Sequence, residues 1–292
     1  MVLSLEEDTQ NDSADFSIGP TRDGPLPALQ TCMETWTLDA PHLTFLQPAV
    51  SPRPPWLRIK AQSKARAHEL FARLPQDGLA IVGTRRPSRR ALHDVHRVLT
   101  QLSPDSGRII ISGLAFGLDA EAHEAALKLG FPTIAVLAGG VEDVYPSAHR
   151  ELAMRILAQG GVIVSEKLDD HSKPWKGEFL ARNRIISALS KAVWIAEAGD
   201  PSGALSTAHW AVNQGVDVYA TPFHPSDAVG AGNRKLLLRS QAIRFGRPRA
   251  CVRLGLICVY ARIHRSRKHP QWGRANKNCG NCCETRTASA DP

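Results

Sequence analysis

From residue 78 onward, short apolar runs alternate with longer segments whose apolar residues recur at helical spacing. The apolar runs are four to six residues long, which is typical of buried strands. The predicted strands cover residues 79–83, 109–112, 133–137, 162–165, 192–197 and 216–220. The segments between them favour helices over residues 88–102, 118–129, 148–159, 181–189 and 204–214.

The regular alternation of strand and helix predicts an α/β fold, a mainly parallel sheet with helices on both faces. Nearly every predicted strand ends in small or polar residues, as at Gly83-Thr84, Ser112-Gly113 and Glu197-Ala198. Ligands of such sheets bind beyond the carboxyl ends of the strands. We therefore expect one edge of the sheet to carry the functional site.

The flanking segments differ in character. Residues 1–55 are acidic, proline-rich and without periodicity, which predicts a disordered or loosely attached segment. Apolar residues over residues 56–74 predict one amphipathic helix leading into the core. Residues 251–292 form a basic, cysteine-containing tail without a recognisable domain, and a drifted reading frame would give the same pattern. The predicted folded domain is therefore residues 56–250.

The net charge of +8 is unevenly distributed along the chain. Residues 1–50 hold one basic and eight acidic side chains, whereas residues 51–250 hold 27 basic and 18 acidic ones. The predicted domain is thus basic in its own right, which favours an anionic partner. The alternative interpretation is an ordinary solvated basic surface.

No stretch approaches the roughly 18 apolar residues of a membrane span, and the acidic first residues argue against a secretory signal. Cys32 is the only cysteine before position 251, so we expect a cytoplasmic protein without core disulfides. Cys279-Gly-Asn-Cys282 has metal-ligand spacing, but no second motif completes four zinc ligands. We therefore expect no metal and no cofactor.

The most informative stretch is residues 179–190, which places Phe179, Arg182, Asn183 and Arg184 at the carboxyl edge of the predicted sheet. The segment just before it adds the cation of Lys176. An aromatic ring beside a guanidinium and an amide suits a base that stacks while its phosphate is held. The alternative is a surface loop entering a helix, with Phe179 in the core.

Two strand-to-helix turns add candidate phosphate contacts. Gly83 permits close backbone approach, and Arg85 offers a guanidinium fork, although an ordinary turn with an exposed arginine is equally consistent. Ser112 and Gly113 are small residues at a similar junction, where backbone groups form a phosphate-sized cradle.

Asp119 and His123 lie four residues apart on one predicted helix face, so their side chains can touch. An acid/base pair is conceivable, but a helix-stabilising pair is the simpler interpretation. No nucleophile–base motif and no carboxylate cluster of metal-ion type is present. The edge is suited to holding phosphates rather than cutting them.

Taken in order, these motifs resemble the DprA/Smf family of DNA-processing proteins. The resemblance runs from about residue 78 to residue 245, at family-like spacing. The matching pieces are GTRRPS (83–88), SGLAFGLDAEAHEAAL (112–127), TIAVLAGGVEDVYP (133–146), VSE (164–166), FLARNRIISALS (179–190) and EAGDPSGALSTAHWA (197–211).

The resemblance implies an extended Rossmann-like fold that binds single-stranded DNA and is not an enzyme. It also implies a homodimer that protects incoming DNA in natural transformation and helps to load the RecA recombinase. By the same resemblance, Arg85 matches the family's Gly-Ser/Thr-Arg turn, and Ser112 and Gly113 match its phosphate-cradling turn. The family's Lys-x-x-Phe-x-x-Arg-Asn strip falls on Lys176, Phe179, Arg182 and Asn183.

The sequence departs from the family pattern in places. Ser206 stands where the family has isoleucine, and Pro222-Phe223-His224 replaces its Pro-Gly after the last strand. An enzyme of phosphoribohydrolase type, with Asp119 or Glu166 as acid/base, is the alternative, although its Pro-Gly-Gly-x-Gly-Thr turn is absent. A decayed, inactive copy is a third hypothesis.

Overall fold

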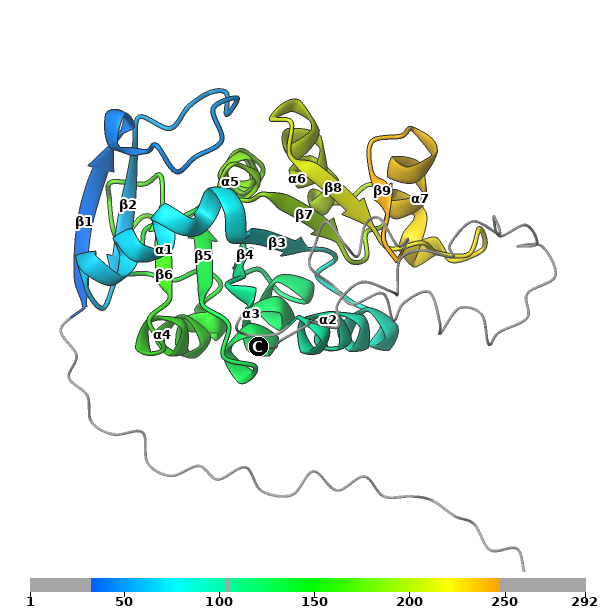
Figure 1. Ribbon diagram of the computed structural model, residues 1–292, viewed down its shortest axis with the longest axis horizontal. Coiled ribbons are helices and arrows are strands. Elements are labelled where there is room, and N and C mark those ends of the chain that lie inside the picture. Colours follow the sequence, from blue (N-terminus) through cyan, green and yellow to red (C-terminus); the bar gives the residue numbers. More distant parts are fainter. Residues whose placement is uncertain (1–32, 103–105, 247–292) are drawn as a thin grey trace, which may run out of the picture. The chain divides into compact units, whose positions relative to one another are not determined.

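The computed structural model describes residues 33–102 and 106–246, which are built around one nine-stranded sheet (Figure 1). The strand order is β1-β2-β6-β5-β4-β3-β7-β8-β9. The strands are β1 (Glu34–Asp39), β2 (Trp56–Ala61), β3 (Gly78–Val82), β4 (Ile109–Ser112), β5 (Thr133–Leu137), β6 (Val162–Ser165), β7 (Ala192–Ile195), β8 (Asp217–Ala220) and β9 (Ile243–Arg244).

Strands β3 to β9 are parallel, while β2 pairs antiparallel with β6 and β1 antiparallel with β2. The chain builds β4, β5 and β6 to one side of β3 and then returns to build β7, β8 and β9 on the other. Strands β3 and β7 are therefore the switch point, where the connections leave a crevice at the carboxyl edge.

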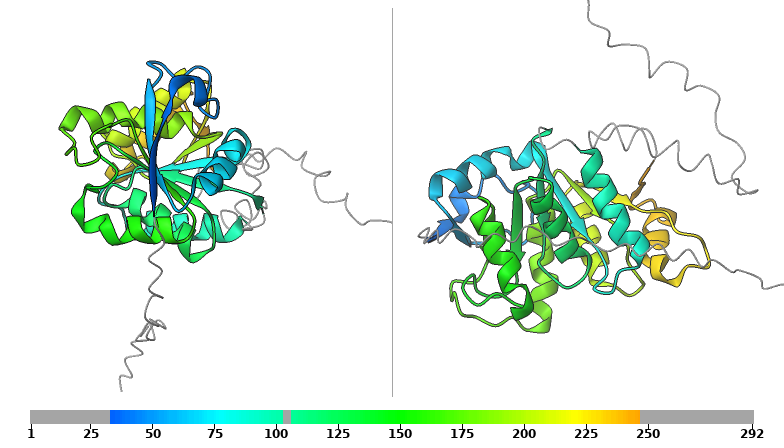
Figure 2. Two further views of the ribbon diagram at one scale, coloured as in Figure 1. Left: turned by 90° about the vertical axis from the view of Figure 1, so that its left-hand side faces the viewer. Right: turned by 90° about the horizontal axis from the view of Figure 1, so that it is seen from below.

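Helices cover both faces of the sheet, as the two views of Figure 2 show. Helices α2, α3 and α4 pack on one face, and α1, α5, α6 and α7 pack on the other. The helices are α1 (Lys64–Asp77), α2 (Arg89–Gln101), α3 (Leu118–Lys128), α4 (Arg150–Ala158), α5 (Lys176–Ala188), α6 (Gly203–Asn213) and α7 (Ala231–Leu238), with 3-10 turns η1 (Ala40–His42), η3 (Ser147–His149) and η4 (Ala228–Gly230).

Alternating side chains of each parallel strand fill two different cores. In β3, Leu79 and Ile81 point towards α2 and α3, while Ala80 and Val82 join the core on the opposite face. Because both faces are covered, every residue of β3 is buried, and the strand is a continuous apolar run rather than an alternating one. This pattern made the strands recognisable, and the predicted α/β fold is confirmed.

The predicted helix over residues 56–74 is wrong in its first part. Residues 56–61 form β2, whose residues alternate between half-buried and buried, and α1 begins only after Ser63. The Ser63 side chain accepts a hydrogen bond from the Arg66 backbone N–H (3.2 Å) and caps the helix. The alternation Leu57, Ile59, Ala61 has the period of a strand, which the helical interpretation overlooked.

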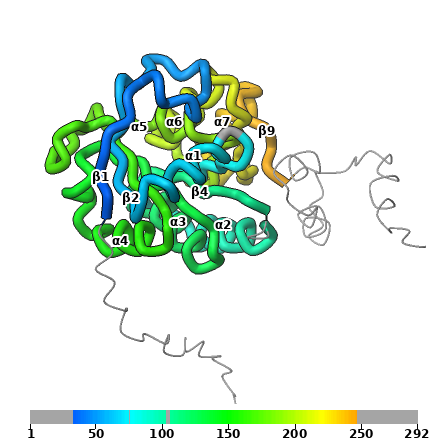
Figure 3. Tube along the Cα trace, turned by 60° about the vertical axis from the view of Figure 1, so that its left-hand side comes forward, coloured from blue at the N-terminus to red at the C-terminus, as the bar shows by residue number. Residues whose placement is uncertain are grey.

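The prediction of a loose segment over residues 1–55 does not hold for its described part. Residues 34–39 form β1, and Leu43, Leu46 and Val50 are buried in the core. Figure 3 shows the chain passing from β1 through this loop into β2 and on to α1. The predictions for residues 1–32 and for the tail at 251–292 lie outside the described residues.

A buried asparagine on α7 joins the carboxyl ends of β7 and β8. The Asn233 side-chain oxygen accepts from the Ala198 N–H (2.7 Å), and its amide donates to the carbonyls of Ile195 (2.9 Å) and Thr221 (3.1 Å). Asn233 is fully buried. These bonds give the Ala198 N–H and the Thr221 carbonyl a partner where the strands end, whereas the Ile195 carbonyl also accepts from the Thr221 N–H (3.2 Å).

Replacing Asn233 with alanine is therefore expected to lower the free energy of unfolding by about 2–4 kcal/mol, because a buried N–H loses its acceptor. Urea denaturation followed by circular dichroism measures the change. Asn213→Ala, at an exposed position of α6, is the matched control and should stay within about 0.5 kcal/mol of the wild type. Equal stability of the two variants would contradict the assigned role of Asn233.

Candidate nucleic-acid interface

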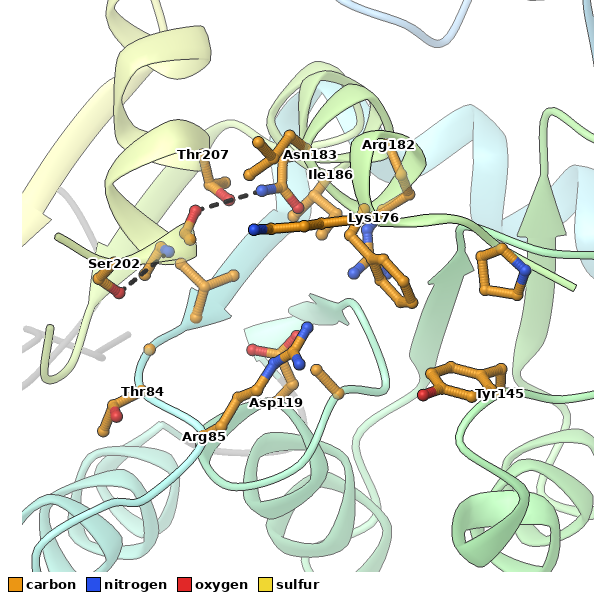
Figure 4. Close-up of a pocket in the computed structure, with 18 residues that line it drawn as sticks. Thr84, Arg85, Asp119, Tyr145, Lys176, Arg182, Asn183, Ile186, Ser202 and Thr207 are labelled. Carbon is orange, nitrogen blue, oxygen red and sulfur yellow. Dashed lines mark hydrogen bonds between the residues drawn. The ribbon is translucent and has the colours of Figure 1, made fainter.

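A cavity of about 630 Å³ lies at the switch point, beyond the carboxyl ends of β3 and β7 (Figure 4). Its walls come from the end of β3 and the turn after it, from α5 and from the start of α6, with single residues from α3 and from the loops after β4, β5 and β6. It is lined by Val82, Gly83, Thr84, Arg85, Ala115, Asp119, Tyr145, Pro174, Lys176, Phe179, Leu180, Arg182, Asn183, Ile186, Ser202, Gly203, Ala204 and Thr207.

The turn after β3 is fixed by a buried carboxylate. Both oxygens of Glu197 are bonded to Ser88, one to its N–H (3.0 Å) and the other to its hydroxyl. The Glu197 carbonyl also accepts from the Thr84 N–H (2.8 Å). A side chain at Gly83 would overlap Leu118 and lie 2.8 Å from that carbonyl, which explains the glycine. The turn is thus held at both ends, and Arg85 projects from it.

Arg85 and Phe179 meet across the mouth of the cavity. The Arg85 guanidinium carbon lies 5.5 Å from the centre of the Phe179 ring, which is a cation–π contact. Tyr145 lies 5.7 Å from the same ring at a tilt of 56°. Arg85 is exposed, and within the described chain it forms no ion pair. The cavity therefore offers an aromatic surface next to an uncompensated cation.

Lys176, the first residue of α5, is exposed and lines the same cavity. The nearby acid Glu178 is already engaged, because it forms an ion pair with Lys167 and accepts from the Trp175 N–H (3.0 Å). Lys176 thus remains directed at the cavity rather than at its own helix, as Figure 4 shows.

Arg182 differs from its neighbours because it is buried. Its Nη1 donates to the carbonyls of Gly113 (2.6 Å) and Val136, and its Nε has no hydrogen-bond partner within the described residues. Burial lowers the pKa of Arg182 to about 10, with nearby Asp119 opposing the shift. It therefore forms a positively charged floor under the cavity rather than an exposed guanidinium.

Ser112 and Gly113 lie behind the buried Arg182 side chain and do not line the cavity. The Ser112 hydroxyl donates to the Ile81 carbonyl (2.7 Å), and the Gly113 N–H donates to an Asp119 oxygen (3.2 Å). A side chain at Gly113 would lie 2.5 Å from the Arg182 guanidinium. The small residues expected to cradle a phosphate thus make room for Arg182, and their polar groups already have partners.

Asn183 is mostly buried, and its side-chain amide donates to the Gly203 carbonyl (3.2 Å), drawn in Figure 4. This bond joins α5 to the start of α6 across the cavity. Five of the seven predicted site residues therefore line one cavity: Arg85, Lys176, Phe179, Arg182 and Asn183.

Asp119 lines the cavity, whereas the predicted contact between Asp119 and His123 is not formed. Burial raises the pKa of Asp119, against the opposing effect of Arg182 and of backbone N–H groups. His123 instead bonds through Nδ1 to the Thr133 hydroxyl (2.7 Å). Glu166, the other candidate acid, does not line the cavity and is paired with Arg184 (2.5 Å).

Two residues at the site were missed at the level of sequence. Tyr145, which lines the cavity, was not singled out, and Glu197 was named only as the end of a predicted strand. A charged residue at the end of a fully apolar run is the signal that could have marked Glu197, because a buried carboxylate requires donors.

Residues 70–252 match the family model of DNA recombination-mediator protein A. The chain belongs to this family. Protein Smf of Synechocystis sp. is 44% identical over 148 residues, which are 51% of this chain and 36% of that protein. DNA processing protein DprA of Bacillus subtilis is 37% identical over 159 residues, 54% of this chain and 52% of that protein.

Two solved structures of DNA processing protein A are similar to this chain. The Streptococcus pneumoniae protein has a TM-score of 0.63 at 30% identity, covering 75% of this chain and 74% of its own. The Helicobacter pylori protein, described for its single-stranded DNA binding mode, has a TM-score of 0.62 at 25% identity, covering 82% and 99%. The chain spans about half or less of the length of the two curated relatives.

The described residues contain no helix long and apolar enough to cross a membrane. They also contain no group of three or more histidine, cysteine or acidic residues that could hold a metal ion. The C-x-x-C motif at 279–282 lies outside them.

The buried His123 gives the stability of this family member a defined pH dependence. Thr133 Oγ1 donates to the Ile110 carbonyl (2.9 Å), so it accepts the proton on Nδ1 of His123. Nε2 has no hydrogen-bond partner among the described residues, and burial lowers the pKa of His123 to about 3. The unfolded chain takes up a proton near pH 6.5. Stability should therefore fall as pH falls below about 6.5, by about 1.4 kcal/mol per pH unit from this group.

His123→Asn keeps a donor near the Nδ1 position but removes the titration. Urea denaturation of both proteins at about pH 7 and about pH 5 should give a smaller loss of stability for the variant. The same pH slope in both proteins would contradict the assignment, since all other titrating groups are shared.

Proposed function

We propose that this protein binds single-stranded DNA at the switch-point cavity and performs no chemistry on it. The observation that carries the proposal is the exposed Arg85 lying over Phe179, 5.5 Å from the ring centre, above the buried cation of Arg182. The description of the Helicobacter pylori relative as a single-stranded DNA binder supports the same ligand.

Each side chain would have its own role. Phe179 supplies the face on which one base stacks, because every base has a π-face and stacking tolerates any sequence. Arg85 and Lys176 hold the adjoining phosphates from opposite sides of the cavity. Arg182 attracts the strand through its field and fixes the wall between α5 and β4, whereas Ser112, Gly113 and Asn183 position the groups that touch DNA.

The proposal predicts salt-sensitive binding of a fluorescein-labelled oligothymidylate by the full chain, measured by fluorescence anisotropy at two salt concentrations. Phe179→Ala should weaken binding by roughly 1–3 kcal/mol through lost stacking. Arg85→Ala and Lys176→Ala should each weaken it and lower the salt dependence.

Lys191→Ala is the matched control, because Lys191 is exposed just before β7 at the opposite edge of the sheet. It removes one positive charge without touching the cavity. If Arg85→Ala and Lys176→Ala bind no worse than Lys191→Ala, the cavity is not the binding site.

An enzyme of phosphoribohydrolase type is the alternative that one observation favours, since the pKa of Asp119 is raised inside the cavity. We propose that Asp119 instead holds the Gly113 N–H beside Arg182. Release of free base from a panel of nucleoside monophosphates, abolished by Asp119→Asn, would support the enzyme and contradict this proposal.

On the same basis we propose a cytoplasmic homodimer that protects incoming DNA in natural transformation and helps to load the RecA recombinase. Support comes from membership of the recombination-mediator family. Light scattering should give twice the mass of one chain. On DNA covered by single-strand-binding protein, the wild type should shorten the lag of RecA ATPase activity, whereas Phe179→Ala should not. No change in the lag would contradict this part of the proposal.

A further inference from the structure

A second arginine lies over a second aromatic ring at the same edge of the sheet. The Arg90 guanidinium carbon is 5.1 Å from the centre of the Phe223 ring, compared with 5.5 Å for Arg85 and Phe179. Arg85 lies in the turn after β3, and Arg90 lies five positions further on in the first turn of α2. Phe223 stands where the sequence departs from the Pro-Gly of the family pattern. The arrangement of an arginine over an aromatic ring, seen in the cavity, therefore occurs a second time outside it.

Phe223 lies in the loop after β8, and hydrogen bonds within this loop fix its conformation. One side of its ring lies against Gly230, where a side chain would overlap Phe223 Cγ. Arg234 closes the loop by donating to the carbonyls of His224 (2.9 Å) and Asp227 (2.5 Å). Arg90 also lies over this ring; its side chain is 47% exposed and is held only by the long contacts with Pro222 and Asp94, which a phosphate can replace.

The two arginine–aromatic pairs lie along one line of strand ends. In the sheet, β7 separates β3 from β8, so the two turns are about 10 Å apart at the carboxyl edge, from two strand spacings. The acidic groups between them already have partners: Glu197 is buried and accepts hydrogen bonds from Ser88, and Asp200 is paired with Lys235 (2.8 Å).

The surface beside this line is basic. Arg86 and Arg89 are exposed and form no ion pair among the described residues. Arg90 makes two long contacts, one with the Asp94 carboxylate (3.7 Å) and one with the Pro222 carbonyl (3.4 Å). A solvated patch of arginines would explain the charge alone. A solvated patch would not explain why the Phe223 ring lies under Arg90 on a loop that Arg234 holds in place.

We propose that Arg90 and Phe223, with Arg86 and Arg89, form a second subsite for the same DNA strand, which leaves the cavity across the end of β7. A base stacks on Phe223 in place of the Arg90 guanidinium, which turns to the adjoining phosphate. This inference rests on the proposed function, because the cavity anchors the first nucleotides. The subsite lengthens the bound strand and is insensitive to sequence.

Oligonucleotide length separates the two sites. The full chain is titrated with labelled oligothymidylates of about 5 and about 20 nucleotides, which lie near and beyond the span of a single site. Phe223→Leu keeps apolar packing on Gly230 but removes the stacking face, and Arg90→Gln removes the charge without a core change. Each should weaken binding of the long strand, Phe223→Leu by roughly 5- to 160-fold, and leave the short strand unchanged. Phe223→Trp should bind the long strand as tightly as the wild type or more tightly.

Four outcomes decide between the hypotheses. Loss confined to the long strand supports the second subsite. If Phe179→Ala weakens both strands while Phe223→Leu and Arg90→Gln match Lys191→Ala, the inference is wrong and the pair only braces the loop. Equal weakening of both strands by Arg90→Gln likewise overturns it, since the residue then acts on the cavity. If Phe179→Ala weakens neither strand, the proposed function itself fails.

Discussion

The buried carboxylate of Glu197 is the constraint on which the rest of the site depends. A carboxylate removed from water is costly unless donors surround it, and here Ser88 supplies an N–H and a hydroxyl. Since Glu197 follows β7 and Ser88 precedes α2, this contact joins the two halves of the fold at the point where the strand order reverses. The position of the arginine-bearing turn is thereby set by a polar contact in an otherwise apolar region.

The second determinant is a buried cation, Arg182, that lies near a buried acid, Asp119. Nη1 of Arg182 donates to two backbone carbonyls, and the guanidinium keeps its positive charge beside the cavity. Asp119 accepts a hydrogen bond from the Gly113 N–H. The two groups share a wall but form no direct ion pair among the described residues. Arg85 and Lys176, which line the same cavity, form no ion pair in the described part of the chain, so an anion entering it would meet positive charge without a carboxylate partner.

The strands of the parallel sheet were predictable because burial on both faces gives continuous apolar runs, as in β4 and β5. Strand β2 was not, because six residues with mixed burial fit a helical period almost as well as a strand. At the site, residue types identified Arg85, Lys176 and Phe179, whose side chains project from their elements. The burial of Arg182 could not be predicted, because it depends on Gly113 and Val136, far away in sequence. Tertiary contact decides whether an arginine faces solvent or the core.

The loop between β1 and β2 has a consequence for where the folding unit begins. Gln47 bonds to the carbonyls of Ala188 (2.8 Å) and Ser190 (3.0 Å), and Arg184 donates to the Pro52 carbonyl (2.8 Å). These contacts clamp the last turns of α5, the helix whose first turns carry Lys176 and Phe179. A fragment cut at residue 70, where the family match starts, would bare the edge of β6 and release one end of that helix. The family match therefore begins inside the folding unit: the contacts that hold α5 in place come in part from residues before position 70.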